Sequence, residues 1–423
     1  MTAEIIATSN EIVDEHGVSL KARLKKAERT ERIRTFGLVA PLLAFILVTF
    51  VFPIVLMIYR SVDDPIAIRA IPETLHALES WEPPNPPDEA VYETFAKELL
   101  AARDTGDLGK LATRLNYDVP GSRSAVTQAA RAAKGAPEAG ESYREVFEKV
   151  DKKWGQPEIW AGLKTLDSPY TSSYYLAALD LSRDMNGHVA SKPQEERIYV
   201  GLFIKTLWVS ALVTGLCILL AYPIAYQLAV LPKGVANLLI ILVLLPFWTS
   251  LLVRTTSWIV LLQSNGVVND ILVALGILSD DGRIQMIYNM FGTVVAMTHI
   301  LLPFMVLPLY SVMTTIPSNY MRAATSMGAT PARAWIDVYF PLTVPGVGAG
   351  SVLVFILCIG YYITPALVGG RTGQLISSSI AYHMQTSLNW GLAAALGTIL
   401  LVGVLALYWI YNRLAGIDNL KMG

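Results

Sequence analysis

Six long apolar runs constrain the fold of this chain more than any other feature of its sequence. Roughly 20 consecutive apolar residues let a helix cross the hydrocarbon core of a bilayer, and each run meets that length. The first run is longer than the apolar segment of a signal peptide and has no small-residue cleavage site behind it, so we expect an uncleaved anchor. The sequence therefore predicts an all-α membrane protein with six transmembrane helices. The runs cover residues of about 35–59, 200–230, 235–262, 287–315, 347–368 and 390–411.

The composition excludes several other classes of protein. Only 16% of the 423 residues are charged, and 53% are hydrophobic. Residues 60–199 hold 17 Lys and Arg and 23 Asp and Glu, whereas residues 198–423 hold 9 and 5. The net charge of −1 argues against a nucleic-acid partner. The five histidines are scattered, Cys217 and Cys358 lie inside apolar runs, and no nucleotide-binding loop or nucleophile elbow is present. We therefore expect no metal site, no cofactor and no catalysis in this chain.

Lys and Arg residues indicate how the helices are oriented. Seven of them lie between residues 21 and 34, just ahead of the first run. Because cytoplasmic flanks are enriched in Lys and Arg, we expect the N-terminus in the cytoplasm, and six crossings return the C-terminus to that side. The expected parts are a cytoplasmic segment 1–34, a first transmembrane helix 35–59, a periplasmic insertion 60–199, a core of five transmembrane helices 200–415, a cytoplasmic loop 317–346 and a cytoplasmic tail 416–423.

The insertion between the first and second transmembrane helices has its own helical pattern. Apolar residues spaced three and four apart predict helices at 91–111 and 142–163. Trp81 begins a proline-rich stretch, which we expect to be a stiff linker ahead of the first of these helices. Two interpretations stay open for this large, mostly helical insertion: a packed cap on the outer face of the membrane, or a docking surface for a partner protein.

The loop between the fourth and fifth runs has the pattern of two short helices joined by a glycine. Ser318 or Asn319 can cap the first helix, which we expect to end at Gly328, a residue suited to the left-handed conformation. The second helix begins at a Thr-Pro pair, and a Phe-Pro pair is expected to end it. Trp335 and Phe340 are expected to be exposed and to fit a socket on another protein, although the loop can also fold back on its own helices. The residues of this candidate coupling loop are Arg322, Ala323, Ala324, Gly328, Ala329, Thr330, Trp335, Phe340 and Pro341.

This loop resembles a motif of a known family. The stretch from Ala323 to Ala329, Ala-Ala-x-x-x-Gly-Ala, followed by the Phe-Pro pair, resembles the EAA loop by which permease subunits of binding-protein-dependent ABC importers engage their ATPase. Arg322 stands where the family pattern has its glutamate, and Phe-Pro stands for Leu-Pro. The resemblance covers about 35–60 and 198–415 and leaves the insertion out. Segments similar to the spermidine/putrescine-type permease subgroup lie at 245–255, 263–269 and 362–370.

The resemblance implies a fold, a function and partners. The fold is that of a type I (MetI-like) ABC importer permease in the bacterial inner membrane. The expected partners are a dimer of ABC ATPases that hydrolyses ATP, a second and different permease subunit, a periplasmic solute-binding protein and the lipid membrane. The implied solute is a polyamine such as spermidine or putrescine, with an opine, an aminophosphonate or another small amino compound as the alternative. An ion-coupled secondary carrier and a membrane-anchored sensor are the rival classes.

One arginine inside an apolar run bears on the translocation path. Arg254 is expected to face protein or a water-filled cavity, unless its side chain extends to the outer interface. No Asp or Glu lies within any of the six runs, which disfavours a proton- or sodium-coupled carrier. Aromatic faces can attract a cation, although interface anchoring and core packing are commoner roles for such residues. The candidate path residues are Trp248, Arg254, Trp258, Tyr361 and Tyr362.

Overall fold

We describe the protein from a computed structural model, which covers residues 20–135, 142–183 and 188–415. The chain divides into two compact units, residues 1–59 and residues 60–423. Within the described residues, six helices are long and apolar enough to cross a membrane, as the sequence predicted. The first 19 residues and the predicted tail at 416–423 lie outside the described residues.

The first unit contains a long helix with a π turn inside it. The helix α1 spans Leu20–Ile46, the π turn η1 spans Leu47–Val51, and α2 spans Phe52–Arg60. Pro53 gives a physical reason for the turn. In a regular α-helix its ring would clash with the carbonyl group four residues earlier, and the wider π turn relieves that clash. The candidate membrane span here is Glu31–Arg60.

The insertion is a helical domain with an aromatic core of its own. The side chains of Tyr92, Phe95, Phe147, Trp154 and Trp160 are fully buried. The Tyr92 hydroxyl donates to the Trp154 carbonyl oxygen at 2.5 Å, and Trp160 Nε1 donates to the same oxygen at 3.0 Å. The elements are α3 (Ile66–Ala70), α4 (Pro72–Glu79), α5 (Glu89–Asp104), α6 (Leu108–Asp118), α7 (Ser122–Ala133), α8 (Tyr143–Val150), η2 (Lys152–Gly155), α9 (Pro157–Lys164), α10 (Ser173–Ala178), β1 (Leu181–Arg183), β2 (Val189–Ser191) and η3 (Gln194–Glu196).

Both helices predicted in the insertion are divided. The helix predicted at 91–111 ends with α5, because Gly106 takes φ +79 and the chain begins α6 afresh at residue 108. The helix predicted at 142–163 is α8, the 3-10 turn η2 and α9, and Pro157 starts the last of them. The antiparallel pair β1–β2 was not predicted, because strands of three residues are too short to leave a periodic pattern.

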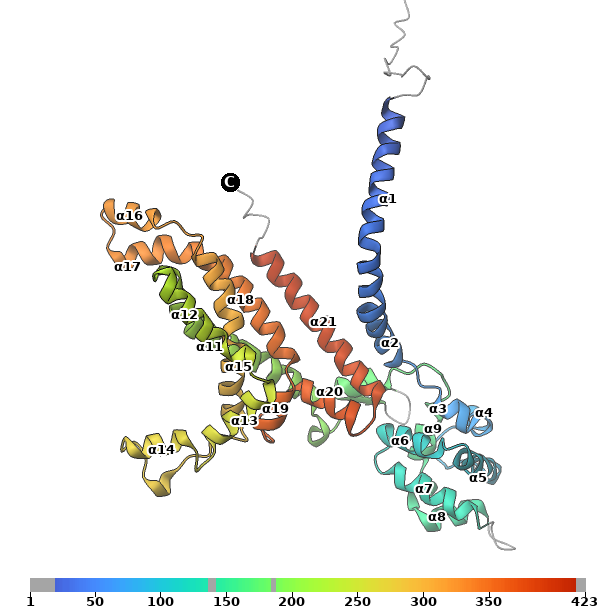
Figure 1. The fold of residues 1–423 in the computed structure, drawn as a ribbon. Helices are drawn as coiled ribbons and strands as arrows, with labels where there is room; N and C mark the ends of the chain where they lie inside the picture. The colour runs from blue at the N-terminus through green and yellow to red at the C-terminus, as the bar shows by residue number, and fades with distance from the viewer. Residues whose placement is uncertain (1–19, 136–141, 184–187, 416–423) are drawn as a thin grey trace, which may run out of the picture. The chain divides into compact units, whose positions relative to one another are not determined.

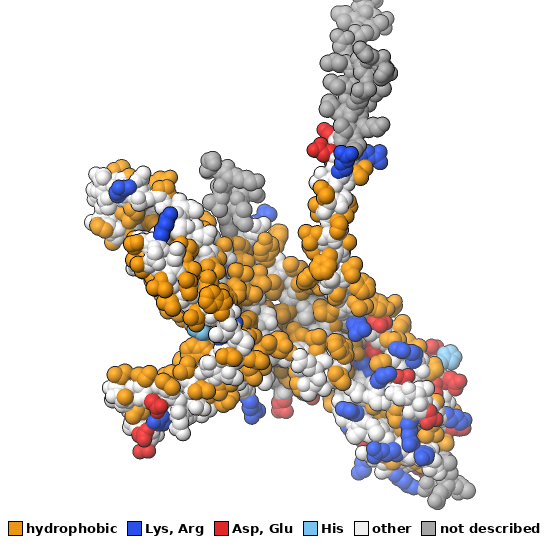
Figure 2. Space-filling view, in the orientation of Figure 1, with side chains coloured by type: hydrophobic (Ala, Val, Ile, Leu, Met, Phe, Trp, Pro, Cys, Tyr) orange, Lys and Arg blue, Asp and Glu red, His pale blue; other side chains and the backbone are white. Residues whose placement is uncertain are grey.

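The core contains long helices that match four of the predicted runs, and α16 and α17 lie at one end of this bundle (Figure 1). Hydrophobic side chains cover the core helices, whereas most of the charged side chains in view lie on the insertion (Figure 2). The core elements are α11 (Tyr199–Val230), α12 (Lys233–Leu244), η4 (Leu245–Trp248), α13 (Leu251–Leu262), α14 (Val267–Ala274), η5 (Asp280–Gly282), α15 (Met290–Met313), α16 (Asn319–Ser326), α17 (Pro331–Ala334), η6 (Trp335–Tyr339), α18 (Phe340–Gly360), α19 (Ile363–Val368), α20 (Ile376–Gln385) and α21 (Trp390–Ala415).

The third predicted run, 235–262, is not one helix. Its first part, Lys233–Trp248, is a short apolar helix, and the candidate span in this region is Leu251–Ala274. The break follows Pro246, and Ser250 then starts α13 by accepting a hydrogen bond from the Val253 amide at 3.2 Å. A serine cap inside an apolar run satisfies an amide that would otherwise lack a partner at a new helix start.

Close packing between α15 and α18 holds the core together. A Cβ atom added at Gly346 would lie 3.0 Å from Val312 Cβ and 3.3 Å from the Leu309 Cα. One added at Gly350 would lie 3.4 Å from the Met305 carbonyl oxygen. Glycines four residues apart let the two helix backbones approach closely, a common device in membrane helices.

The insertion is joined to the core through the start of α11. The carboxylate of Asp180, a buried residue, accepts hydrogen bonds from the amides of Ile198 and Tyr199 at 3.0 Å and of Val200 at 2.8 Å. The Tyr199 hydroxyl lies 2.9 Å from Nε2 of His383 in α20, and burial lowers the pKa of His383. A carboxylate at a helix N-terminus satisfies free amides and complements the helix dipole. The first turn of α11 is therefore fixed from both the insertion and α20.

Candidate coupling loop and translocation path

The first helix of the loop, α16, ends in a glycine turn of well-defined geometry. Gly328 takes φ +93, which confirms the predicted left-handed position. Its amide donates to the Thr325 carbonyl at 3.0 Å, and the Ala329 amide donates to the Ala324 carbonyl at 3.1 Å. These two bonds define a Schellman motif, in which the last carbonyls of a helix find partners. Ala324 is buried, whereas Ala323 is exposed.

The second helix of the loop does not end at the Phe-Pro pair. Thr330 caps it as predicted, accepting from the Arg333 amide at 3.4 Å, with Pro331 at the first position. The chain then passes through the π turn η6 into α18 without a break, so that Pro331–Gly360 is one helical stretch. In the turn, the Phe340 amide bonds to the Trp335 carbonyl, five residues earlier. The prediction of an end was wrong because a π turn removes the clash that Pro341 would cause in an α-helix.

The aromatic side chains of the loop pack against the C-terminal part of α11. The ring centroid of Tyr222 lies 5.6 Å from that of Trp335 and 5.9 Å from that of Phe340. Tyr226, one turn further along, lies 5.4 Å from Tyr339 in the same way. The prediction that both Trp335 and Phe340 are exposed was wrong for Trp335, which is half-buried, and Phe340 is 41% exposed. Sequence reasoning overlooked the two tyrosines, although their spacing of four residues places them on one helix face.

The exposed surface of the loop is formed by other residues. Met327, next to the glycine turn, is 83% exposed, Ile336 is 57% exposed and Tyr320 is 52% exposed. Arg322, which stands in place of the family glutamate, donates to Ser318 Oγ at 3.2 Å and also to the Asn319 side chain. Its guanidinium therefore supports the start of α16.

Three of the predicted path residues come together in the core. Arg254 in α13 is half-buried, and its Nε atom is buried without a hydrogen-bond partner among the described residues. One turn further, Trp258 Nε1 donates to His299 Nδ1 at 3.2 Å, and the two ring centroids are 5.4 Å apart. The Arg254 charge lies within electrostatic range of both His299 and Tyr361. The arrangement places the Arg254 charge near a Trp258–His299 pair, and His299 is the member that sequence reasoning left out.

The remaining path residues are more exposed. Trp248 ends η4 and is 75% exposed, and Tyr362 precedes α19 and is 37% exposed. Near them, the hydroxyl oxygens of Thr255 and Thr364 lie 3.3 Å apart and both residues are fully buried. This contact ties α13 to α19, so it fixes the helix that carries Arg254.

Three carboxylates lie within the candidate spans, which extend beyond the predicted runs, and this corrects the prediction that the spans lack them. Glu31 is the first residue of the span Glu31–Arg60. Asp270 belongs to the span Leu251–Ala274 and lies 2.7 Å from Arg283. Asp337 belongs to the span Pro331–Gly360 and lies 3.9 Å from Arg333. All three lie toward an end of their spans, and Asp270 and Asp337 have basic partners, so none is an isolated charge at the centre of a helix.

The core matches a known protein family. Residues 198–416, just over half of the chain, match the family described as binding-protein-dependent transport system inner membrane component. This chain belongs to that family. It is an ABC importer permease, a transport subunit of the inner membrane with several membrane-spanning helices, and its fold is the MetI-like fold that the sequence predicted.

Two relatives at more than 30% identity, PotB and YdcU, agree with this assignment. The spermidine/putrescine transport system permease protein PotB of Escherichia coli is 33% identical over 220 residues, which are 51% of this chain and 79% of PotB. The inner membrane ABC transporter permease protein YdcU of Escherichia coli is 31% identical over 231 residues, covering 52% of this chain and 73% of YdcU. A chain of a bacterial alginate ABC transporter crystal structure aligns with a TM-score of 0.43 and 21% identity, over 53% of this chain and 80% of that one. The family match leaves out the insertion.

Proposed function

We propose that this permease forms part of the path by which an ATP-driven importer takes up a small organic amine, a polyamine such as spermidine or putrescine. The observation that carries the proposal is the similarity of the core to permease proteins of spermidine/putrescine transport systems. In this proposal a second permease subunit completes the path, a dimer of ABC ATPases binds the loop between α15 and α18, and a periplasmic protein delivers the solute.

The proposed motion begins at the coupling loop. Nucleotide-driven closure of the ATPases moves the exposed residues around Met327, and the loop passes this motion to α18 because Pro331–Gly360 is one helical stretch. The contacts of Tyr222 with Trp335 and Phe340 pass part of it to α11. Nucleotide binding then biases the bundle between inward- and outward-facing states.

The proposal fixes the side of the membrane on which each part lies. The loop and both termini are cytoplasmic, and the insertion is periplasmic. Both native cysteines are buried, so single cysteines can be introduced at exposed positions as reporters. Cysteine at Met327, 83% exposed, should react with a membrane-impermeant maleimide only after the membrane is opened, and cysteine at Tyr170, 61% exposed, should react in intact spheroplasts. The reverse pattern would contradict the topology.

Uptake tests the transport activity itself. The complete transporter, reconstituted in liposomes with its binding protein, should accumulate labelled putrescine or spermidine only with ATP on the ATPase side. Accumulation driven by a proton or sodium gradient without ATP would support the secondary carrier instead. Accumulation of neither polyamine, while ATP hydrolysis responds to the binding protein, would show that the solute is a different one.

A specific observation favours a second candidate solute. The Arg254 guanidinium is half-buried, and its Nε atom has no hydrogen-bond partner among the described residues, so it is better suited to an anionic group than to a polyamine. An opine or an aminophosphonate is therefore the second candidate. If the solute carries an anionic group, Arg254→Gln should reduce its uptake strongly and Arg254→Lys should restore part of it. If the solute is a polyamine, removing this positive charge should leave uptake unchanged or raise it.

A further inference from the structure

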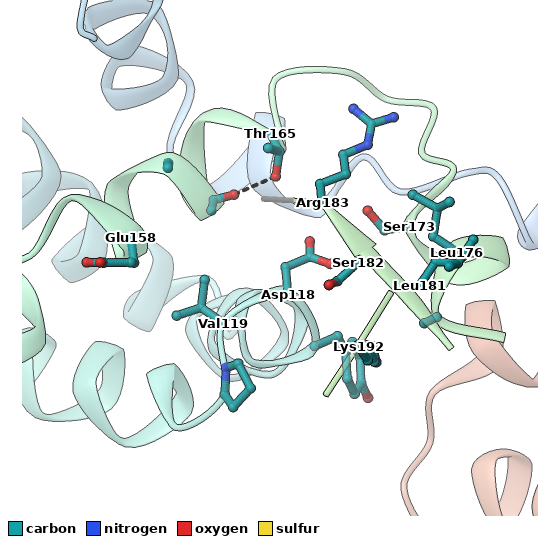
Figure 3. A pocket seen from close by; sticks show the side chains of 15 residues that line it. Asp118, Val119, Glu158, Thr165, Ser173, Leu176, Leu181, Ser182, Arg183 and Lys192 are labelled. Carbon is teal, nitrogen blue, oxygen red and sulfur yellow. Dashed lines mark hydrogen bonds between the residues drawn. The ribbon is translucent and has the colours of Figure 1, made fainter. Parts of the chain in front are cut away.

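The insertion contains a cavity that the family match does not reach. Its volume is about 470 Å³, and it lies among α6, α9, α10 and the β1–β2 hairpin (Figure 3). Small-molecule sites in proteins commonly have volumes of about 300–1,000 Å³, with mostly apolar walls and a few polar groups. Val119, Ala161, Leu176 and Leu181 supply apolar surface here, and charged and hydroxyl side chains are set among them. The cavity has the size and lining of a small-molecule site.

One carboxylate of this cavity belongs to a buried charge network. Asp118 Oδ2 accepts from Arg114 Nη1 at 2.6 Å, and Arg114 also pairs with Asp64. The Arg114 and Asp64 side chains are 2% and 4% exposed, whereas that of Asp118 is 24% exposed. The Arg114 guanidinium thus pairs with two carboxylates, so the three side chains together carry one formal negative charge. Asp118 is the member of this network that lines the cavity. In Figure 3 its carboxylate points inward beside Ser182.

Two basic residues of the β1–β2 hairpin line the cavity, one at each end of the hairpin. Arg183, at the end of β1, donates from Nη2 to Ser172 Oγ at 2.9 Å, and it is exposed at the rim. Lys192 follows β2, and its backbone amide is held by the Asp180 carbonyl at 3.0 Å. Glu158 lies on the opposite wall, and Figure 3 shows its carboxylate turned away from Asp118. The cavity therefore combines one inward carboxylate, Asp118, with the Arg183 guanidinium at its rim and Lys192 at the other end of the hairpin.

We propose that this cavity binds a small zwitterionic amino compound, with its ammonium group on Asp118 and its anionic group on Arg183 at the rim. A ligand that is only a cation would be repelled by the positive charges of Arg183 and Lys192 and would leave them uncompensated. A ligand that is only an anion would face the uncompensated charge of the Asp118 network. A zwitterion satisfies both sets of groups, and its carbon chain can lie on the apolar walls. The inference goes beyond the proposed function, since it concerns the insertion and needs no transport.

Three ligands with related carbon chains test the chemistry on the complete transporter in nanodiscs without ATP. L-ornithine carries ammonium and carboxylate groups, putrescine lacks the carboxylate, and pentanoate lacks the amines. Calorimetric titration should show binding of ornithine and much weaker binding of the other two. Arg183→Gln should weaken ornithine about tenfold or more, the effect of losing one charge-assisted hydrogen bond, and should leave putrescine unchanged or improved. Arg131→Gln changes an exposed arginine of α7 away from the cavity and should have no effect.

A second variant guards against misfolding. Asp118→Asn should weaken ornithine about tenfold or more, but it also disturbs the pair with Arg114. Ala161→Phe leaves every charge in place and fills the cavity from α9, so it should abolish ornithine binding at an unchanged unfolding temperature. Ornithine binding that survives Ala161→Phe, equal binding of ornithine and putrescine, or no ornithine binding at millimolar concentration would each overturn the proposal. Failure of the proposed function is a separate result, because a variant such as Gly328→Val should lose uptake and keep this binding.

Discussion

The glycine turn of the coupling loop gives the sharpest test of how the permease engages its ATPase. A Cβ atom added at Gly328 meets no atom within 4 Å, so a substitution there adds no steric contact. The penalty comes from the backbone alone, because φ is +93. A residue other than glycine held in such a conformation costs about 1–3 kcal/mol, with β-branched residues at the upper end. If the ATPase binds only the turned loop, its affinity should fall by about 5- to 150-fold.

A series of substitutions measures this effect. Gly328→Asn should weaken ATPase binding least, since asparagine tolerates the left-handed region, Gly328→Ala should be intermediate and Gly328→Val should be strongest. The assay is titration of the purified ATPase onto permease in nanodiscs, with membrane insertion checked by yield. Gly106 offers a matched control: it has φ +79, no atom within 4 Å of an added Cβ, and two capping bonds of the same kind at the end of α5.

The two positions separate strain from docking. Gly106→Val should cost the insertion a similar amount of stability and leave ATPase affinity unchanged. An unchanged affinity in Gly328→Val, or an equal loss in both valine variants, would refute the docking role of the turn.

Three further perturbations test other contacts. Tyr222→Ala removes the ring contacts with Trp335 and Phe340, and each contact contributes about 0.5–1.5 kcal/mol. The variant should weaken the coupling of ATP hydrolysis to uptake more than it weakens ATPase binding. Gly346→Leu forces α18 away from α15 and should lower the unfolding temperature sharply, whereas Gly360→Leu, with no atom within 4 Å, should not; similar losses in both would contradict the packing argument. Burial lowers the pKa of His383 below its ordinary value near 6.5, so the unfolded state binds more protons and stability should fall as pH drops below about 6.5. Unfolding followed from pH 7.5 to pH 5 checks this, and His383→Gln should flatten the profile.

Much of the fold could be predicted because a bilayer leaves few alternatives. Backbone groups in hydrocarbon need internal partners, so each long apolar run had to be helical, and six candidate spans were found, although the third run is divided after Pro246. The end of α16 at Gly328 was also predictable, since the glycine turn is a local property of the chain.

The predictions of helix ends failed where the local signals in the sequence did not decide whether the backbone continues as a helix. Phe340-Pro341 is a strong stop signal in sequence, but a bond from Phe340 to the residue five positions earlier let the helix continue. The break after Pro246 was hidden because the apolar run continues on both sides of it. In the insertion, by contrast, Gly106 and Pro157 are visible signals of helix boundaries. The prediction gave more weight to the helical periodicity around them and so missed both boundaries.

The candidate site was predictable in part. Arg254 stood out because a charge inside an apolar run is costly, and that cost is independent of the fold. Its closeness to His299 and Tyr361 depends on how α13, α15 and the start of α19 pack, which no spacing along the chain encodes. The contact of Tyr222 with Trp335 spans more than a hundred residues and depends on tertiary packing in the same way.

The unbroken stretch from Pro331 to Gly360 is a lever. At 1.5 Å per residue its 30 residues are about 45 Å long. A tilt of roughly 10° about the glycine turn would sweep the far end, next to Tyr361, through about 8 Å, a distance comparable to the width of a small organic solute. If ATPases bind the loop end of this stretch, as proposed, a small tilt there is enough to open or close a passage near Tyr361, and a flexible segment inserted between the two ends would uncouple them.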